Sequence, residues 1–366
     1  MRKVLFFLFS AGLFSAQNVE FTDVNFKNAI IKAYPNVDAN KDNEISLEEA
    51  KTLTSIRNLS GFPKITNAKG IEAFVNLTEL DLGQKDLTTI DVSANVKLTN
   101  LNIKENKLAG TLDLTNLSTL KNLELNKNSL TSLVLPQNGM IEILYCNENK
   151  LTTIDVSKLP NLKRLFLVKN EITTLNLSQN LLLERLHIDN NKIVNLNLTN
   201  LTKLNWMSVN NNLLTQITFH NNPLLKSIIA QNNTIAELNF QDGFTNAITL
   251  INLTGNTDYK KIIKDCSDTL PSVTVTVEDN CTTLGVDSLP SKTLQIYPNP
   301  VQENIYFSEN IFVESYQIFN MEGKLVITGK SNNEIKLIPV QALKSGNYIL
   351  KLKTKKGNTV HRFMKI

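Results

Sequence analysis

The chain has 366 residues, of which 42% are hydrophobic and 20% charged, and its formal net charge is +4. This length exceeds one average domain, and the hydrophobic fraction excludes an intrinsically disordered chain. The net charge is too small to indicate nucleic-acid binding. The sequence holds 50 Asn but only 3 His and 3 Cys. So many Asn residues indicate a repeated backbone geometry that uses side-chain amides, and so few His and Cys disfavour a metalloenzyme or a thiol protease.

Residues 1–16 form a predicted secretory signal peptide. The first three residues include two basic side chains, and an almost unbroken apolar run follows from Val4 to Phe14. The alternative is a buried N-terminal helix. The run is too short to span a bilayer, and no later stretch is long and apolar enough to do so. We therefore expect a mature chain outside the cytoplasm without a transmembrane span.

Residues 17–76 are predicted to form a small helical cap that contains a calcium loop at residues 38–49. A helical pattern precedes this loop and a second one follows it. Oxygen ligands fall at positions 1, 3, 5, 7, 9 and 12 of the loop, which resembles an EF-hand site. The predicted ligands are Asp38, Asn40, Asp42, Glu44 (through its backbone carbonyl), Ser46 and Glu49. Asn43 stands where Gly is usual, and Asn tolerates the left-handed conformation needed there. One loop of this kind favours a single structural calcium ion, and an acidic surface loop is the alternative.

Residues 77–256 contain nine copies of the pattern L-x-x-L-x-L-x-x-N. The copies begin 21 to 23 residues apart, at Leu77, Leu98, Leu120, Ile141, Leu162, Leu183, Leu204, Leu225 and Ile248. The L-x-L alternation predicts a short strand with inward leucines, and stacked copies share one core. The Asn at position 9 is expected to satisfy backbone groups of neighbouring turns, although Lys85 replaces it in the first copy. The second half of each repeat alternates again, which favours a second strand rather than a helix.

This array resembles the 21-residue leucine-rich repeats of bacterial internalins. The resemblance implies a binding scaffold that is not an enzyme. We expect the third and fifth positions of each repeat to face a concave surface. The first three repeats place acidic and polar residues there, whereas repeats four to seven contain aromatic, apolar and basic side chains. The predicted partner-binding residues are Ile143, Tyr145, Arg164, Phe166, Val168, Arg185, His187 and Trp206.

Residues 257–291 are predicted to form a C-terminal cap and a linker. Cys266 and Cys281 flank a strand-like run, so we expect a disulfide between them. Cys146 occupies an apolar repeat position and is expected to be a buried thiol.

Residues 292–366 are predicted to form a separate module of six or seven short strands in a β-sandwich. Its pattern Tyr297-Pro-Asn-Pro300, the turn at Gly323, the sequence Gly346-Asn-Tyr348 and the basic end resemble a type A sorting domain of type IX secretion. That resemblance implies contact with the type IX secretion machinery, export across the outer membrane of a Gram-negative bacterium, and removal of the module. An immunoglobulin-like adhesion module is the alternative.

The expected fold is therefore mainly β, a leucine-rich repeat solenoid between a helical EF-hand-like cap and an immunoglobulin-like β-sandwich. The expected function is that of a secreted or cell-surface adhesin or recognition protein. It would bind a protein or peptide through its concave face, as a monomer and without nucleic acid. The alternative is a structural surface protein, or a glycan-binding accessory module, that has no dedicated protein partner.

Overall fold

The computed structural model describes residues 17–272, 276–279 and 296–366, apart from positions 58, 60, 138, 244, 258, 322, 355 and 356. The predicted signal peptide and Cys281 lie outside these residues, so the signal peptide and the disulfide stay predictions. The chain divides into two compact units, Met1–Asp279 and Asn280–Ile366.

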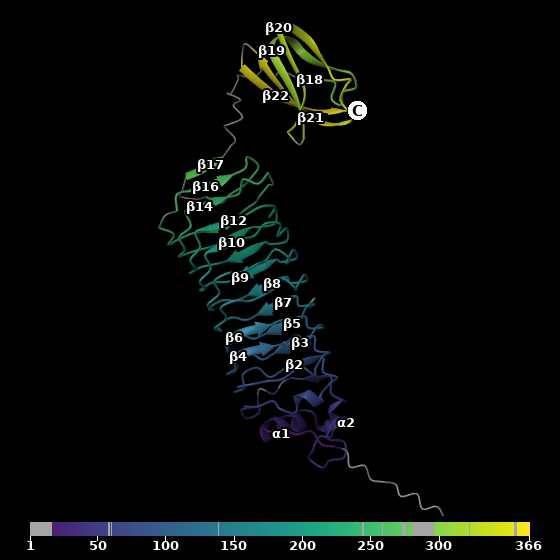
Figure 1. The fold of residues 1–366 in the computed structure, drawn as a ribbon, viewed down its shortest axis with the longest axis vertical. Coiled ribbons are helices and arrows are strands. Elements are labelled where there is room, and N and C mark those ends of the chain that lie inside the picture. Colours follow the sequence, from purple (N-terminus) through teal and green to yellow (C-terminus); the bar gives the residue numbers. More distant parts are fainter. Residues whose placement is uncertain are drawn as a thin grey trace, which may run out of the picture. The chain divides into compact units, whose positions relative to one another are not determined.

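Ten short parallel strands, one from each turn, form the main sheet of the first unit (Figure 1). Neighbouring strands pair in register one repeat apart, so that Leu144 lies beside Leu165 and Leu165 beside Leu186. These leucines are fully buried because the alternation directs them into the shared core. The strands are β1 (Ser55–Ile56), β2 (Glu79–Asp81), β3 (Asn100–Asn102), β5 (Asn122–Glu124), β7 (Ile143–Tyr145), β8 (Arg164–Phe166), β9 (Arg185–His187), β11 (Trp206–Ser208), β13 (Ser227–Ile229) and β15 (Leu250–Asn252). The predicted solenoid is confirmed.

The second half of several repeats also forms short parallel strands. One set contains five strands and the other contains two. Among the described residues of 77–256 there is no helix, which confirms that the second half of the repeat is extended. The five-stranded set continues beyond residue 256 through its last two strands. The strands are β10 (Asn195–Asn197), β12 (Gln216–Thr218), β14 (Glu237–Asn239), β16 (Lys261–Lys264) and β17 (Thr276–Asp279), with β4 (Ala109–Asp113) and β6 (Ser129–Val134) in the smaller set.

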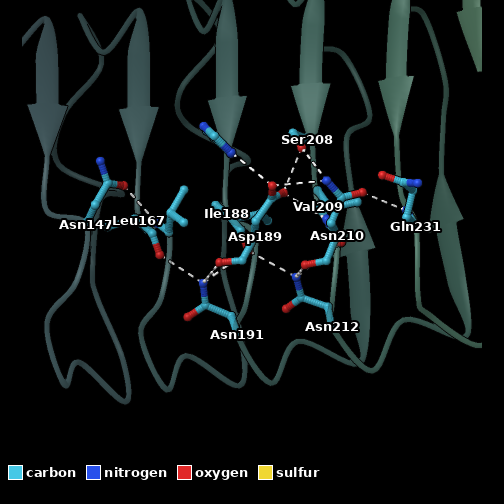
Figure 2. A network of polar contacts seen from close by, with 12 residues as sticks. Asn147, Leu167, Ile188, Asp189, Asn191, Ser208, Val209, Asn210, Asn212 and Gln231 are labelled. Carbon is cyan, nitrogen blue, oxygen red and sulfur yellow. Dashed lines mark hydrogen bonds and ion pairs between the residues drawn. The ribbon is translucent and has the colours of Figure 1, made fainter. Parts of the chain in front are cut away.

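The Asn at position 9 holds successive turns together through its side-chain amide, as Asn191 shows (Figure 2). Its Nδ2 donates to the carbonyl of Leu167 at 2.8 Å and to that of Ile188 at 3.0 Å, and its Oδ1 accepts from the amide of Ile172 at 3.0 Å. The side chain turns inward because the residue before it adopts a left-handed conformation, with φ 57° at Asn190. This conformation recurs at the same position of the earlier and later repeats. The bonds satisfy groups that the bend leaves without a ladder partner.

In the first repeat, a Lys side chain takes the place of this Asn as a hydrogen-bond donor. Lys85 is 3% exposed, and its Nζ donates to the carbonyl of Leu59 in the preceding turn. Burial, followed by repulsion from Lys64, lowers the pKa of this amine from its ordinary value. Lys85 therefore replaces one amide donor at the end of the ladder.

The cap of the first unit is helical. Asp23 starts the first helix, because its carboxylate accepts from the Asn25 amide at 2.9 Å. Phe26 and Ile30 on its inner face are fully buried in the core that the repeats continue. The helices are α1 (Val24–Ala33), η1 (Pro35–Val37), α2 (Leu47–Ala50) and η2 (Ile71–Ala73).

The second unit is an antiparallel sheet of five strands with its own core. Six or seven short strands were expected, but two of the five are long. Bulges such as that between Val313 and Ser315 let one strand bend without ending, so segments that read as separate strands are continuous. The hairpin across Asn320 and Gly323 is confirmed. The strands are β18 (Ile296–Tyr297), β19 (Asn304–Asn320), β20 (Leu325–Pro339), β21 (Gly346–Thr354) and β22 (Gly357–Lys365).

Candidate functional site

A row of four rings crosses the main sheet of the first unit, one from each of β7, β8, β9 and β11. Tyr145 and Phe166 stack with their centroids 4.6 Å apart and their planes at 25°. Phe166 meets His187 edge-on at 6.0 Å, and His187 meets Trp206 edge-on at 5.3 Å. All four rings are partly exposed. We call these four side chains the ring row.

A polar network centred on Asp189 fixes the imidazole in this row, and Figure 2 shows Asp189 with its partners Ser208 and Asn210. His187 Nε2 lies 3.0 Å from Asp189 Oδ2. The same carboxylate accepts from Ser208 Oγ at 2.7 Å, from the Asn210 amide at 2.8 Å and from Asn210 Nδ2 at 3.0 Å. Burial works to raise the pKa of Asp189, but the hydrogen bonds from His187, Ser208 and Asn210 outweigh it, so the pKa is lowered. Asp189 is therefore ionised, and it holds the imidazole of His187 in one orientation.

Two guanidinium groups stand beside the rings without a partner among the described residues. Arg164 and Arg185 pair directly in register on β8 and β9. Neither side chain has a hydrogen bond or ion pair to any residue that the structure describes. The adjacent Lys163, by contrast, lies 2.7 Å from the Glu142 carboxylate. Like charges on directly opposed residues destabilise a sheet, so this pair has a cost in the free protein.

The early part of the same sheet differs in charge and in shape. Two of its carboxylates have cationic partners, with Arg57 3.3 Å from Glu79 and Lys104 3.1 Å from Glu124. A shallow hollow of about 320 Å³ lies over β2, β3, β5 and β7 and includes Asp81 and Tyr145 in its lining. This hollow adjoins the ring row at Tyr145.

Seven of the eight predicted partner-binding residues lie on strands β7, β8, β9 and β11, and Ile143 is in register with Arg164. Val168 follows β8 instead, where its amide donates to Asn147 Oδ1 at 2.8 Å. The sequence did not indicate the Asp189 network as a support for the rings. The sequence feature that could have indicated this network is the polar residue at position 7 of the repeat, two residues after the outward position 5. A side chain at position 7 can reach groups of its own repeat and of the next repeat.

The loop at residues 38–49 has the backbone of a turn built around carboxylates. Asp38 accepts from the amides of Asp42 at 3.1 Å and Asn43 at 3.0 Å, and Asn43 has the expected left-handed conformation with φ 63°. Glu49 accepts from the amides of Ala39 and Ser46. Among the residues that the structure describes, no three His, Cys, Asp or Glu side chains are arranged as around a metal ion. The loop carries the predicted oxygen donors, and Glu49 is engaged by the backbone.

The regular spacing of the strands and the Asn at position 9, whose side-chain amide links successive turns, define residues 77–256 as a leucine-rich repeat solenoid. Residues 295–366 match the family model of the secretion system C-terminal sorting domain. This match indicates a protein that a Gram-negative bacterium secretes or displays on its outer surface. In the described part of the chain, no helix has the length and apolar character needed to cross a membrane.

The chain is also similar to individual proteins. It is 37% identical over 83 residues to an ulvan lyase of Nonlabens ulvanivorans, a match of 22% of this chain and 15% of that protein. An internalin, InlF, from Listeria monocytogenes is 20% identical, with a TM-score of 0.35 over 71% of this chain and 95% of that chain. The InlJ functional domain from the same species is 18% identical, with a TM-score of 0.33 over 96% of this chain and 100% of that chain.

Proposed function

We propose that this protein is an adhesin or recognition protein that binds a protein or peptide through repeats four to seven. The ring row is the observation that supports this proposal. Aromatic and Arg side chains are enriched where binding energy concentrates in interfaces. Four ordered rings on successive strands offer such a surface with little side-chain entropy left to lose on binding.

The rigid backing of the rings supports recognition over a purely structural role. Asp189 holds His187, and the solenoid core holds every strand, so a partner meets a surface that is already formed. The sorting domain supports the same proposal, since it places the solenoid where external partners are met. A structural surface protein would not need exposed rings or unpaired guanidinium groups.

Binding of the full-length protein to immobilised matrix proteins and glycans tests the proposal. For any member of this panel that the wild type binds, Trp206→Ala and Tyr145→Ala should each cost about 2 kcal/mol of binding free energy, or roughly thirtyfold in Kd. Asp81→Ala on the early part of the sheet is the matched control and should bind normally. Equal binding by all three folded variants would favour the structural role.

We further propose that the loop at residues 38–49 binds one calcium ion that fastens the cap to the repeats. Asp38, Asp42 and Glu49 have no Lys, Arg or His partner among the described residues, so the loop holds three uncompensated carboxylates. Ser46 and the carbonyl of Glu44 would complete the ligands with Asn40. Binding would draw Glu49 away from the amides of Ala39 and Ser46.

Thermal melting in EDTA and in millimolar calcium tests this second proposal. Calcium should raise the Tm of the full-length protein, because a ligand that binds only the folded state stabilises it. Glu49→Ala should remove the calcium-dependent rise, whereas Glu48→Ala in the same helix should keep it. A wild-type Tm that is the same in both solutions would refute the calcium site.

A further inference from the structure

The two guanidinium groups differ from many of the cations around them in the solenoid. Several lysines of this array pair with a carboxylate one repeat away, as in Lys127 with Glu105 at 3.3 Å and Lys192 with Glu171 at 2.9 Å, whereas others have no such partner among the described residues. Arg164 and Arg185 have Ile143 and Trp206 as their outer neighbours in register, and neither neighbour carries an acid. Within the part of the chain that the structure describes, Arg164 and Arg185 are therefore like charges in direct register with no acid at the register positions on either side.

Two carboxylates near the pair are already engaged, and Glu184, which precedes Arg185, forms no ion pair with either guanidinium group. Glu142 is bound by Lys163 at 2.7 Å, and Asp189 accepts from His187, Ser208 and Asn210. Neighbouring strands lie about 4.8 Å apart, so the two Arg backbones are held at that spacing with like charges side by side. An external anion would relieve this repulsion, and a guanidinium group binds a carboxylate through two parallel hydrogen bonds.

The geometry of the rings decides between two anionic partners. A sugar stacks on the face of a ring, but Tyr145 and Phe166 cover one face of each other, and His187 and Trp206 meet edge to face. The stacked rings thus offer mainly edges to a ligand lying across the strands. Ring edges carry the positive part of the quadrupole and favour anionic oxygen over sugar.

We infer that Arg164 and Arg185, beside the ring row, form a binding site for an acidic peptide segment of the partner. Its carboxylates lie on the two guanidinium groups, and an aromatic or apolar side chain of the peptide packs against Tyr145 and Ile143. This inference rests on the proposed recognition function and adds the chemical class of the ligand.

The single Trp of the chain allows a direct test, because Trp206 lies in the ring row. The full-length protein is titrated with a random Glu–Tyr copolymer, with heparin as an anionic glycan and with neutral dextran, and Trp fluorescence is recorded. The copolymer should give a saturable change. Arg164→Gln with Arg185→Gln should weaken it at least tenfold. Lys158→Gln with Lys203→Gln removes the same charge from exposed positions off the strands and should leave the affinity within twofold.

Several results would overturn the inference. One is the absence of a response to the copolymer, and another is an equal loss of affinity in the Lys158 and Lys203 control. Tighter, Arg-dependent binding of heparin would assign the site to a glycan, and an Arg-dependent dimer in sedimentation would assign it to a second copy. The proposed function fails separately, if Trp206→Ala does not weaken binding to the matrix panel. If Trp206→Ala loses binding to the matrix panel but the Arg double variant retains it, the recognition function stands and only the acidic class of ligand is refuted.

Discussion

The substitution Asn191→Ala removes the side-chain amide at position 9 of one repeat and measures how much that amide contributes to the stability of the solenoid. The substitution removes the donors to the carbonyls of Leu167 and Ile188 and the acceptor for the amide of Ile172. Asn191 is only 8% exposed, so water cannot replace these bonds without opening the turn. A buried group left unpaired costs about 1–3 kcal/mol. Three such groups predict a loss of about 3 kcal/mol or more in the free energy of unfolding.

Urea unfolding of the full-length protein, followed by circular dichroism, gives that free energy for the first unit. Gln179→Ala is the control, because it removes an exposed amide and should change stability by less than about 0.5 kcal/mol. A loss below about 1 kcal/mol in Asn191→Ala would refute the reasoning, because it would show that the three backbone groups find other partners.

Three further predictions concern single groups and the second unit. Burial lowers the pKa of Lys85, so the unfolded chain binds more protons at this amine than the folded protein does. The free energy of unfolding should therefore rise as the pH approaches about 10.4. Urea unfolding at several pH values should show this rise in the wild type and not in Lys85→Met. Burial raises the pKa of Cys146 to about 12, so its thiol should resist a disulfide reagent in the native protein and react only on unfolding, as peptide mapping would show; rapid native labelling would contradict this. Deleting residues 292–366 should leave the protein in the periplasm, whereas an intact Ile366 on surface-exposed protein would contradict removal of the sorting domain.

The repeat architecture could be predicted because its signal is periodic. Each apolar residue at position 4 pairs with its equivalent one repeat away, so the spacing alone fixes the parallel register. The left-handed residue before position 9 could not be predicted, since Gln84, Lys169 and Asn190 have no side-chain chemistry in common. That conformation turns the side chain at position 9 inward, whether it is an Asn or Lys85. The long strand Asn304–Asn320 was also missed, because a bulge and a turn have similar local sequences.

The candidate site was only partly predictable. The outward positions followed from the alternation, so Tyr145, Phe166 and Trp206 could be placed on one surface. The contacts among them depend on side-chain rotamers and on the twist between strands, which the pattern does not contain. The unpaired state of Arg164 could not be read from the sequence either, because Glu142 lies one repeat before Lys163 as well as near Arg164. Only the structure shows that Lys163 takes it.

Hydroxyl-radical footprinting of the bound protein tests the central claim most directly. The full-length protein is oxidised free and in complex with the tightest binder from the matrix panel, and oxidation is mapped residue by residue. The account predicts protection of Tyr145, Phe166 and Trp206, with no change at exposed Met140 or Met321. Unchanged oxidation of the three rings in a saturated complex would contradict recognition through repeats four to seven.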